Sequence, residues 1–366
     1  MLFRSGDAME VTLPDAHVFA STLIEGTSGI GEAVRCATKL AHALGLGEAE
    51  VGRVAQVVAQ AAANIAQHAQ RGEILLRPFT LESPASLEML ALDQGSGMAN
   101  VAEAVRDGFS TAGSPGLGLG AIARNSNHFE ISSTPGKGTA LLARIGPGTP
   151  VRPAQHALEW GAVCVPKRDE EVCGDAWAVN AGEGRSTILI VDGLGHGLLA
   201  FEAAKDAMRT FRAQAGGRPE SILKGMHEAM RATRKTRGAV AAIAEIDWLA
   251  RELRYAGAGN IAGTLVTVGG MASGLVSHNG TLGQSVTRLH AYTYPWPDKG
   301  LLILHSDGLS SHWALNAYPG LTQKDPSLIA GVLYRDFASQ RDDVVVFVGR
   351  ERGHDTNTPG PGGEST

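Results

Sequence analysis

The chain has 366 residues, 43% of them hydrophobic and 19% charged, and a formal net charge of −5. This is the balance of a folded globular protein, and the length suits two hydrophobic cores better than one. No stripe of lysine and arginine points to nucleic acid, and no signal sequence or apolar run of about 20 residues points to a membrane. Three irregularly spaced cysteines do not suggest zinc. We therefore expect a cytoplasmic protein with no nucleic acid or membrane partner.

Residues 8–146 are expected to form a first unit that mixes helices and strands. Apolar residues recur at helical spacing over residues 29–44 and 48–70. The second segment is apolar nearly all round, which predicts a buried helix. Alternation and turn residues predict strands at 9–13, 73–78, 87–93, 128–133 and 139–145, and shorter helices at 101–107 and 119–127.

A linker rich in proline and glycine is predicted at residues 147–157. A second unit follows over residues 158–350, with helices at 199–214 and 219–233 and with strands elsewhere, up to Val348. The polar, Pro/Gly-rich residues 351–366 are expected to be a disordered tail.

Polar and glycine residues in the first unit suggest a nucleotide pocket. Asn64 lies in the buried helix, where its amide needs a partner and could bind phosphate or Mg²⁺. Asp93 ends an apolar strand and could accept a hydrogen bond from an exocyclic amine. Flexible turns that could approach a base or phosphates follow, at Gly95, Gly97, Gly116, Gly118 and Gly120. Each piece alone is more often an ordinary turn or a core amide, but their order favours a nucleotide site.

Aspartates in the second unit recur where apolar strands begin or end. They are Asp175, Asp192 before Gly193, Asp307, and the pair Asp342 and Asp343. Hard cations such as Mg²⁺ and Mn²⁺ bind carboxylates, backbone carbonyls and water. Any single Asp-Gly pair is more often only a turn. The four-part order, with the segment VDGLGHG in it, favours a centre for two metal ions.

The first unit resembles the histidine-kinase-type ATPase fold, in the branch of small serine kinases of bacterial anti-sigma and stressosome switches. The resemblance is carried by the DQGSGM turn, GLGLG and TPGKGT between Asp93 and Arg144. It implies that ATP binds with Mg²⁺ on Asn64, adenine on Asp93, and Thr139 supporting the base pocket. Those kinases place a glutamate general base four residues before the asparagine. Here that residue is Gln60, an amide without useful basicity, so kinase activity stays open.

Residues 160–350 resemble the manganese- or magnesium-dependent serine/threonine protein phosphatases of the sporulation stage II and stressosome type. Besides the aspartate motifs, the segments YAGAGN and GLVSHN carry this resemblance. It implies that Asp192 bridges two Mn²⁺ or Mg²⁺ ions and that the Gly193 carbonyl completes one site. Asp175, Asp307 and Asp342 would hold the metals directly or through water, with Asp192 and Asp175 as the catalytic pair. Asp342 is preferred to Asp343 because it directly follows Arg341.

These resemblances together imply an α+β protein of two domains. The N-terminal domain would be an α/β sandwich of the histidine-kinase-like ATPase type, and the C-terminal one an αββα sandwich of the metal-dependent phosphatase type. The expected function is a bifunctional switch that dephosphorylates, and could also phosphorylate, a STAS-type anti-sigma antagonist or stressosome protein. The alternative is that the N-terminal domain is a catalytically silent nucleotide- or partner-binding module. A homodimer is left open.

Overall fold

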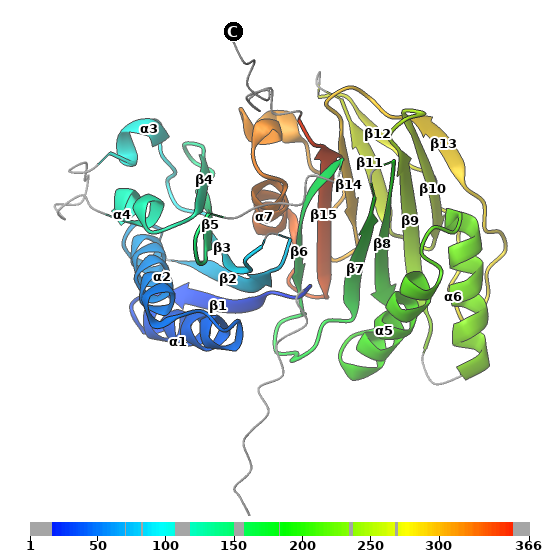
Figure 1. Ribbon diagram of the computed structural model, residues 1–366, viewed down its shortest axis with the longest axis horizontal. Helices are drawn as coiled ribbons and strands as arrows, with labels where there is room; N and C mark the ends of the chain where they lie inside the picture. Colours follow the sequence, from blue (N-terminus) through cyan, green and yellow to red (C-terminus); the bar gives the residue numbers. More distant parts are fainter. Residues whose placement is uncertain are drawn as a thin grey trace, which may run out of the picture.

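The structure is a computed structural model that describes residues 17–69, 71–81, 83–106, 118–149, 157–182, 184–233, 237–267 and 270–353. Three five-stranded sheets and the helices that cover them form successive layers along the long axis of the molecule (Figure 1). Four clusters of buried apolar side chains fill the spaces between these layers. In the described part of the chain, no helix is both long enough and apolar enough to cross a membrane.

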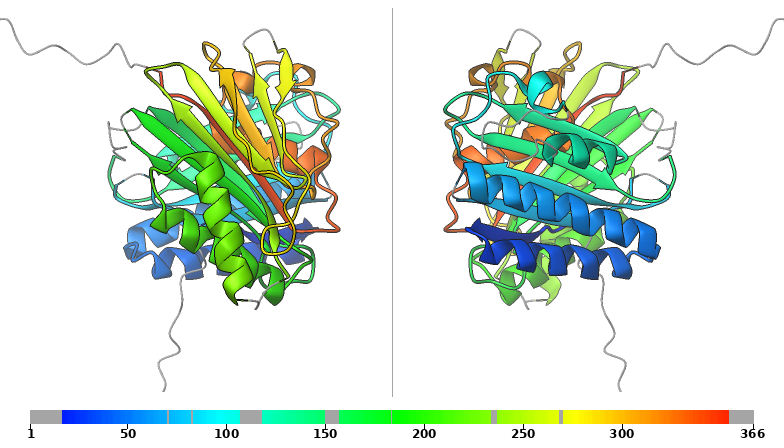
Figure 2. Two further views of the ribbon diagram at one scale, coloured as in Figure 1. Left: turned by 90° about the vertical axis from the view of Figure 1, so that its right-hand side faces the viewer. Right: turned by 90° about the vertical axis from the view of Figure 1, so that its left-hand side faces the viewer.

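The first sheet is entirely antiparallel and is covered on one face by helices. Its strand order is β1 (Ala20–Glu25), β2 (Arg71–Phe79), β3 (Ser86–Asp93), β5 (Thr139–Ile145) and β4 (His128–Ser133). The covering helices are α1 (Ser28–Ala43), α2 (Glu48–His68) and α4 (Gly118–Arg124), while α3 (Val101–Ala104) is a single short turn. Helices α1 and α2 lie side by side across the sheet (Figure 2, right). Side chains alternate along β2, so Ile74 and Leu76 pack under these helices while Leu75 faces the opposite way.

The other two sheets pack face to face. One has the order β12 (Ala272–Gly274), β11 (Ala262–Val266), β14 (Leu301–His305), β15 (Val344–Glu351) and β6 (Leu158–Val165). The other has the order β13 (Tyr292–Pro295), β10 (Glu252–Ala258), β9 (Ala239–Asp247), β8 (Arg185–Gly193) and β7 (Asp175–Ala181). Helices α5 (Leu198–Ala213) and α6 (Pro219–Thr233) cover the outer face of the latter sheet (Figure 2, left).

Helix α7 (Pro326–Phe337) lies between the first sheet and the sheet that contains β6 and β15 (Figure 1). Its residues from Pro326 to Tyr334 are all buried. One cluster joins Leu90 of β3, Leu333 of α7 and Val346 of β15. A single helix therefore covers two sheets at once, and its all-round apolar surface is that of a core helix.

The predicted elements differ from the structure in several places. The predicted strand at 9–13 and most of the predicted linker lie outside the described residues. Strand β1 was not predicted, and α7 was wrongly assigned to strands because its apolar run has no polar face. The tail was predicted to begin at residue 351, but β15 extends through Glu351, which pairs with Leu158. The predicted α+β fold, with its two sandwich types, agrees with the observed layers.

Candidate nucleotide pocket and metal centre

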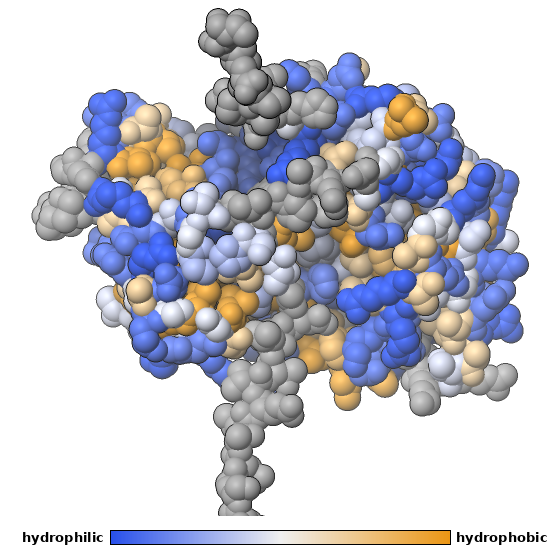
Figure 3. Space-filling model, viewed as in Figure 1, coloured by the Kyte–Doolittle hydropathy of each residue, from blue (hydrophilic) through white to orange (hydrophobic). Residues whose placement is uncertain are grey.

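A pocket of about 490 Å³ opens between α2, α3, α4 and the ends of β3 and β5. Apolar residues gather at the surface on this side of the molecule, around α3 and α4 (Figure 3). Four types of contact that a nucleotide needs are present: an amide, a carboxylate, exposed backbone and apolar side chains. The predicted residues that line the pocket are Asn64, Asp93, Gly97, Gly118 and Thr139.

Asp93 is fixed by the backbone around it. Its Oδ1 accepts hydrogen bonds from the amides of Gly95 at 2.8 Å and Thr139 at 3.2 Å. Among the described residues, no side chain or amide is hydrogen bonded to Oδ2, so this oxygen is available to a ligand in the pocket. Burial raises the pKa of Asp93 above its ordinary value, although the two amides act in the opposite direction. The arrangement suits an acceptor for an exocyclic amine.

The glycines around Asp93 allow close backbone packing. Gly138 has a φ of +76°, and a Cβ there would lie 2.0 Å from the carbonyl oxygen of Asp93, so no other residue fits. Gly118 lies against the side chain of Asn64, at the start of α4. Gly95 acts through its bond to Asp93, and Gly120 is buried within α4, so neither lines the pocket. Gly116 lies outside the described residues.

Gln60 lies one turn before Asn64 on α2 and is half-buried. It is not among the residues that line the pocket. Gln60 therefore lies on the helix that carries Asn64, but outside the pocket lining formed by the described residues.

The second set of residues comes together at one edge of the two packed sheets. Asp175, at the start of β7, is the register partner of Asp192, near the end of β8. Asp307 follows β14, and Asp342 precedes the neighbouring strand β15. At Gly193 a Cβ would lie 2.1 Å from the carbonyl oxygen of Ala200, which explains the glycine after Asp192. Strand ends thus bring together four carboxylates that are far apart in sequence.

These carboxylates repel one another. Burial, followed by the charges of Asp307 and Asp342, raises the pKa of Asp192 to about 8. Burial and the neighbouring Asp192 raise the pKa of Asp175 well above its usual range. Asp175 is only 2% exposed, and its Oδ2 has no hydrogen-bond partner among the described residues. Such a cluster is stable in its charged form only beside cations.

The donor set fits Mn²⁺ or Mg²⁺ in kind. All the candidate ligands are hard oxygen atoms, and the buried Oδ2 of Asp175 has no hydrogen-bond partner in the part of the chain that the structure describes. In the ranges that the structure describes, no three acidic, histidine or cysteine side chains already converge as a closed metal-ligand set. The carboxylates are therefore gathered at one edge but still spread apart.

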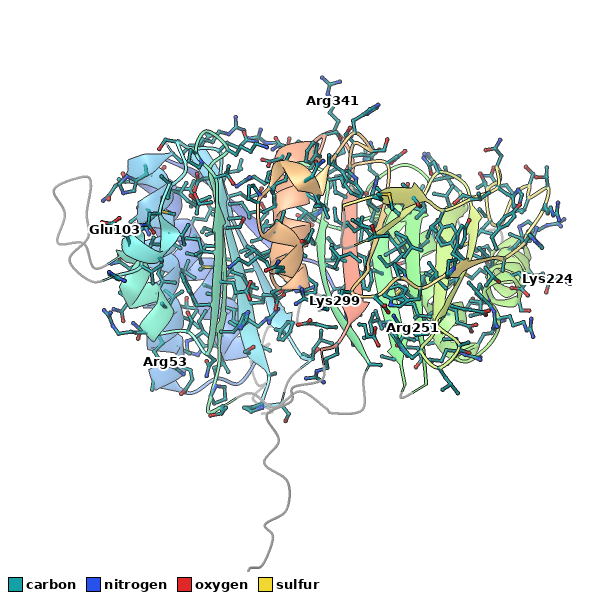
Figure 4. The ribbon with its side chains drawn as sticks, turned by 90° about the horizontal axis from the view of Figure 1, so that it is seen from above. Arg53, Glu103, Lys224, Arg251, Lys299 and Arg341 are labelled. Carbon is teal, nitrogen blue, oxygen red and sulfur yellow. The ribbon has the colours of Figure 1, made fainter. Side chains whose placement is uncertain are left out.

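Two residues near the cluster have positioning roles that the sequence did not reveal. Asn260, the last residue of the YAGAGN segment, donates from Nδ2 to Asp307 Oδ2 at 2.7 Å. Asp343 accepts hydrogen bonds from the amides of Lys167 and Gly174, at 2.8 and 2.9 Å. Both of its oxygens are thus occupied by backbone, which leaves Asp342 as the freer carboxylate. Arg341 is exposed and points away from the molecule (Figure 4).

Fold and site together define a chain with a kinase-like ATPase domain followed by a metal-dependent serine/threonine protein phosphatase domain. Residues 28–145 match the family of the histidine kinase-like ATPase domain, and residues 182–349 match the family of stage II sporulation protein E. The chain belongs to the first family in its RsbT-like branch, and its second part is a phosphatase domain of the type found in RsbX and stage II sporulation protein E.

Two relatives from Bacillus subtilis (strain 168) represent these two parts. Serine/threonine-protein kinase RsbT is 32% identical over 104 residues, which span 28% of this chain and 78% of RsbT. Phosphoserine phosphatase RsbX is 28% identical over 147 residues, which span 39% of this chain and 71% of RsbX. A crystal structure of RsbX in complex with magnesium is 23% identical, with a TM-score of 0.46, and covers 55% of this chain and 98% of that one. The family and fold class predicted from the sequence are confirmed by the family matches.

Proposed function

We propose that this chain is a switch protein whose second domain hydrolyses phosphoserine or phosphothreonine on a partner protein. The observation that carries the proposal is the gathering of Asp175, Asp192, Asp307 and Asp342 at one sheet edge. No described lysine or arginine forms an ion pair with any of these four. A cluster of uncompensated carboxylates is suited to divalent cations rather than to a protein-borne positive charge.

Within this site each residue has a distinct role. Asp192 would bind both cations, with the Gly193 carbonyl beside it, and Asp175, Asp307 and Asp342 would complete the set. Two such cations, Mn²⁺ or Mg²⁺, supply a water nucleophile at neutral pH and neutralise charge on the phosphate.

The supporting residues keep this arrangement in place. Asn260 orients Asp307, and Asp343 keeps the backbone before Asp175 against β15 through the Gly174 amide. Their proposed contribution is geometric, because the amide nitrogen of Asn260 is bonded to Asp307 and both oxygens of Asp343 are bonded to backbone amides.

The proposed substrate is a STAS-type anti-sigma antagonist or a stressosome protein. Support comes from the joining, in one chain, of domains similar to a phosphoserine phosphatase and to a serine/threonine-protein kinase. A chain with both domains could reverse its own modification of one partner. We propose domain limits of 8–146 and 158–350, with a linker at 147–157 and a tail after β15.

The first domain is proposed to bind ATP with Mg²⁺, using Asn64 for the metal and Asp93 for the adenine. Its pocket and the free Oδ2 of Asp93 support binding. The competing proposal is a catalytically silent nucleotide- or partner-binding module, and Gln60 favours it, because an amide cannot act as general base.

The phosphatase proposal is tested on the full chain with Mn²⁺ and a serine-phosphorylated STAS-domain protein. Asp192→Asn should reduce phosphate release by about a thousandfold, since the loss of metal binding removes several kcal/mol of transition-state stabilisation. Asp206→Asn, on α5 and ion-paired to Arg209, is the matched control and should retain activity. Activity that survives a chelator, or the Asp192→Asn change, would refute the metal site. Faster turnover of a free phosphate ester than of the phosphoprotein would refute the protein substrate.

The kinase question needs a separate measurement. The full chain, inactivated by Asp192→Asn, is incubated with labelled ATP and the unphosphorylated STAS-domain protein. Transfer of label to serine would rule out the silent-module proposal, whereas nucleotide binding without transfer would support it.

A further inference from the structure

The C-terminal end of α7 contacts segments from both candidate sites. From the nucleotide pocket, Gln94 follows Asp93 and donates from Nε2 to the carbonyl oxygen of Arg335 at 3.0 Å. From the metal centre, Gly308 follows Asp307 and accepts a hydrogen bond from the Ser339 amide at 2.9 Å. The same short stretch of backbone therefore touches a neighbour of the adenine-binding aspartate and a neighbour of a metal-binding aspartate.

A second contact from the nucleotide pocket reaches the same end of the helix. Lys137 lies in the turn that precedes Thr139, and its Nζ donates to the carbonyl oxygen of Ala317 at 2.9 Å. The same ammonium group lies 4.2 Å from the centre of the Tyr318 ring. The Tyr318 hydroxyl in turn donates to Asp336 at 2.7 Å, in the last turn of α7. Movement of the turn around Lys137 would thus act on α7 through Tyr318.

On the metal side, the residues after α7 are held to the segment that follows Asp307. Ser310 donates from its amide to the Phe337 carbonyl at 3.0 Å, and Leu309 forms an antiparallel bridge with Ala338. Asp342 follows Phe337 by five positions. Two of the proposed metal ligands therefore belong to segments that are hydrogen bonded to each other and to the end of α7.

The two ends of α7 differ in how firmly they are held. Its first residues are buried, and its N-terminus is fixed by the ion pair between Arg144 and Asp325, both about 1–3% exposed. By contrast, the residues from Arg335 to Ala338 are half-buried, and Ser339 is exposed. A change in one site can therefore displace the C-terminal turn while the rest of the helix stays in place.

We propose that nucleotide binding in the first pocket changes the metal affinity of the second site through the C-terminal turn of α7. The proposal concerns regulation and rests on the two sites of the proposed function. Because binding free energies are reciprocal, metal at the aspartates must change the nucleotide affinity by the same factor. The linkage can therefore be measured by binding alone, without turnover of any substrate.

The experiment measures the dissociation constant of a fluorescent ADP analogue with the full chain in saturating Mn²⁺. Asp192→Asn removes the second metal site but leaves the Asn64 site intact, and Asp307→Asn is a second route to the same end. We expect either change to shift the dissociation constant about fivefold, as is typical of coupled sites. In the double variant Gln94→Ala/Lys137→Ala, which alters neither set of ligands, the shift should disappear. Lys224→Ala, which removes an exposed lysine of α6 at the far end of the molecule (Figure 4), should preserve it.

The outcomes separate this proposal from the proposed function. If Asp192→Asn and Asp307→Asn leave the dissociation constant of the ADP analogue unchanged in the otherwise unmodified chain, the proposal is overturned. An equal shift in the double variant would likewise rule out the role of the α7 turn. A shift that depends on Gln94 and Lys137 supports it, even in a chain that fails to dephosphorylate the STAS-domain protein. Efficient dephosphorylation without any shift would leave the phosphatase in place and refute the coupling.

Discussion

Arg144 of β5 and Asp325, the residue that caps α7, form a two-pronged ion pair with N–O distances of 2.9 and 3.0 Å. The same guanidinium donates to Glu88 of β3 at 2.7 Å, and Glu88 is also paired with Arg77 of β2. Two positive and two negative side chains, all nearly inaccessible to solvent, thus join the first sheet to α7. Removing one member of such a group destabilises the fold by more than the intact group stabilises it, because the remaining charged partner stays buried.

Asp325→Ala is therefore expected to destabilise the whole chain by roughly 3–5 kcal/mol, the range for removing one partner of a buried ion pair. Arg144 would lose a partner in a dry environment, and α7 would lose its N-terminal cap. Urea unfolding followed by tryptophan fluorescence measures the change. Asp298→Ala is the control, because Asp298 is 97% exposed in its pair with Arg251 and should contribute less than about 1 kcal/mol. Equal effects of the two substitutions would contradict the prediction.

The same four charged side chains make the free energy of unfolding depend on pH in the acid range. Burial alone would raise the pKa of Asp325, but the charge of Arg144 outweighs it and holds the pKa well below the usual range. For Glu88, burial is likewise outweighed, by Arg77 and Arg144, and the pKa is lowered. A lowered folded pKa gives stability that is complete above the unfolded value of about 4 and is lost as the pH falls through the folded pKa.

The urea midpoint should accordingly fall as the pH is lowered from about 5 to about 3. The side chain of Asp325→Asn does not titrate, so the urea midpoint of this variant should be lower at the upper end of this pH range. It should also fall less as the pH is lowered. If the two proteins showed parallel slopes, Asp325 would not contribute to the acid dependence.

Much of the fold was predictable where periodicity and turns were clear, as in the two helices that end at Ala43 and His68 and in the hairpin of β4 and β5. Helix α7 was missed because it is buried on all sides, and its apolar run at residues 328–333 has the composition of a buried strand. Strand β1 was missed because four of its six residues are exposed or partly exposed at a sheet edge. Both errors reflect tertiary packing that short-range sequence patterns do not encode.

The candidate sites were predicted through their motifs rather than through their supporting contacts. The aspartates were recognisable because each one adjoins an apolar strand. The positioning roles of Asn260 and Asp343 could not be predicted, because each acts on a segment more than 40 residues away. Arg144 and Asp325 are 181 positions apart, so short-range sequence patterns could not predict their buried ion pair either.

Asn260→Ala should weaken metal binding without removing a ligand. Asp307 would lose the amide that orients its Oδ2, and loss of such an outer contact typically costs about 10–100-fold in metal affinity. A manganese titration of phosphatase activity gives the midpoint, which should rise while the maximal rate changes less. Asn180→Ala, at an exposed position of β7, should leave the midpoint unchanged. An unchanged midpoint for Asn260→Ala would show that Asp307 is oriented by other means.

Gln60→Glu tests whether one missing carboxylate limits phosphoryl transfer. If the pocket is otherwise competent, a general base at this position should raise transfer from ATP to the STAS-domain protein by about a hundredfold. The same assay on Gln56→Glu, an exposed residue one turn earlier on α2, controls for added charge. Persistent lack of transfer in Gln60→Glu, with nucleotide binding intact, would mean that the first domain lacks more than its base.

The position of α7 has a consequence for dissecting the chain. A fragment that stops before β6 would present Leu75, Leu90, Leu92 and Leu142 to water, because the helix that packs on them is contributed from beyond residue 325. Supplying the missing half in trans would have to restore that contact along with its buried charges. Neither half is thus expected to be an autonomous folding unit, and swapping the ATPase domain for a relative's would require redesign of the α7 surface as well.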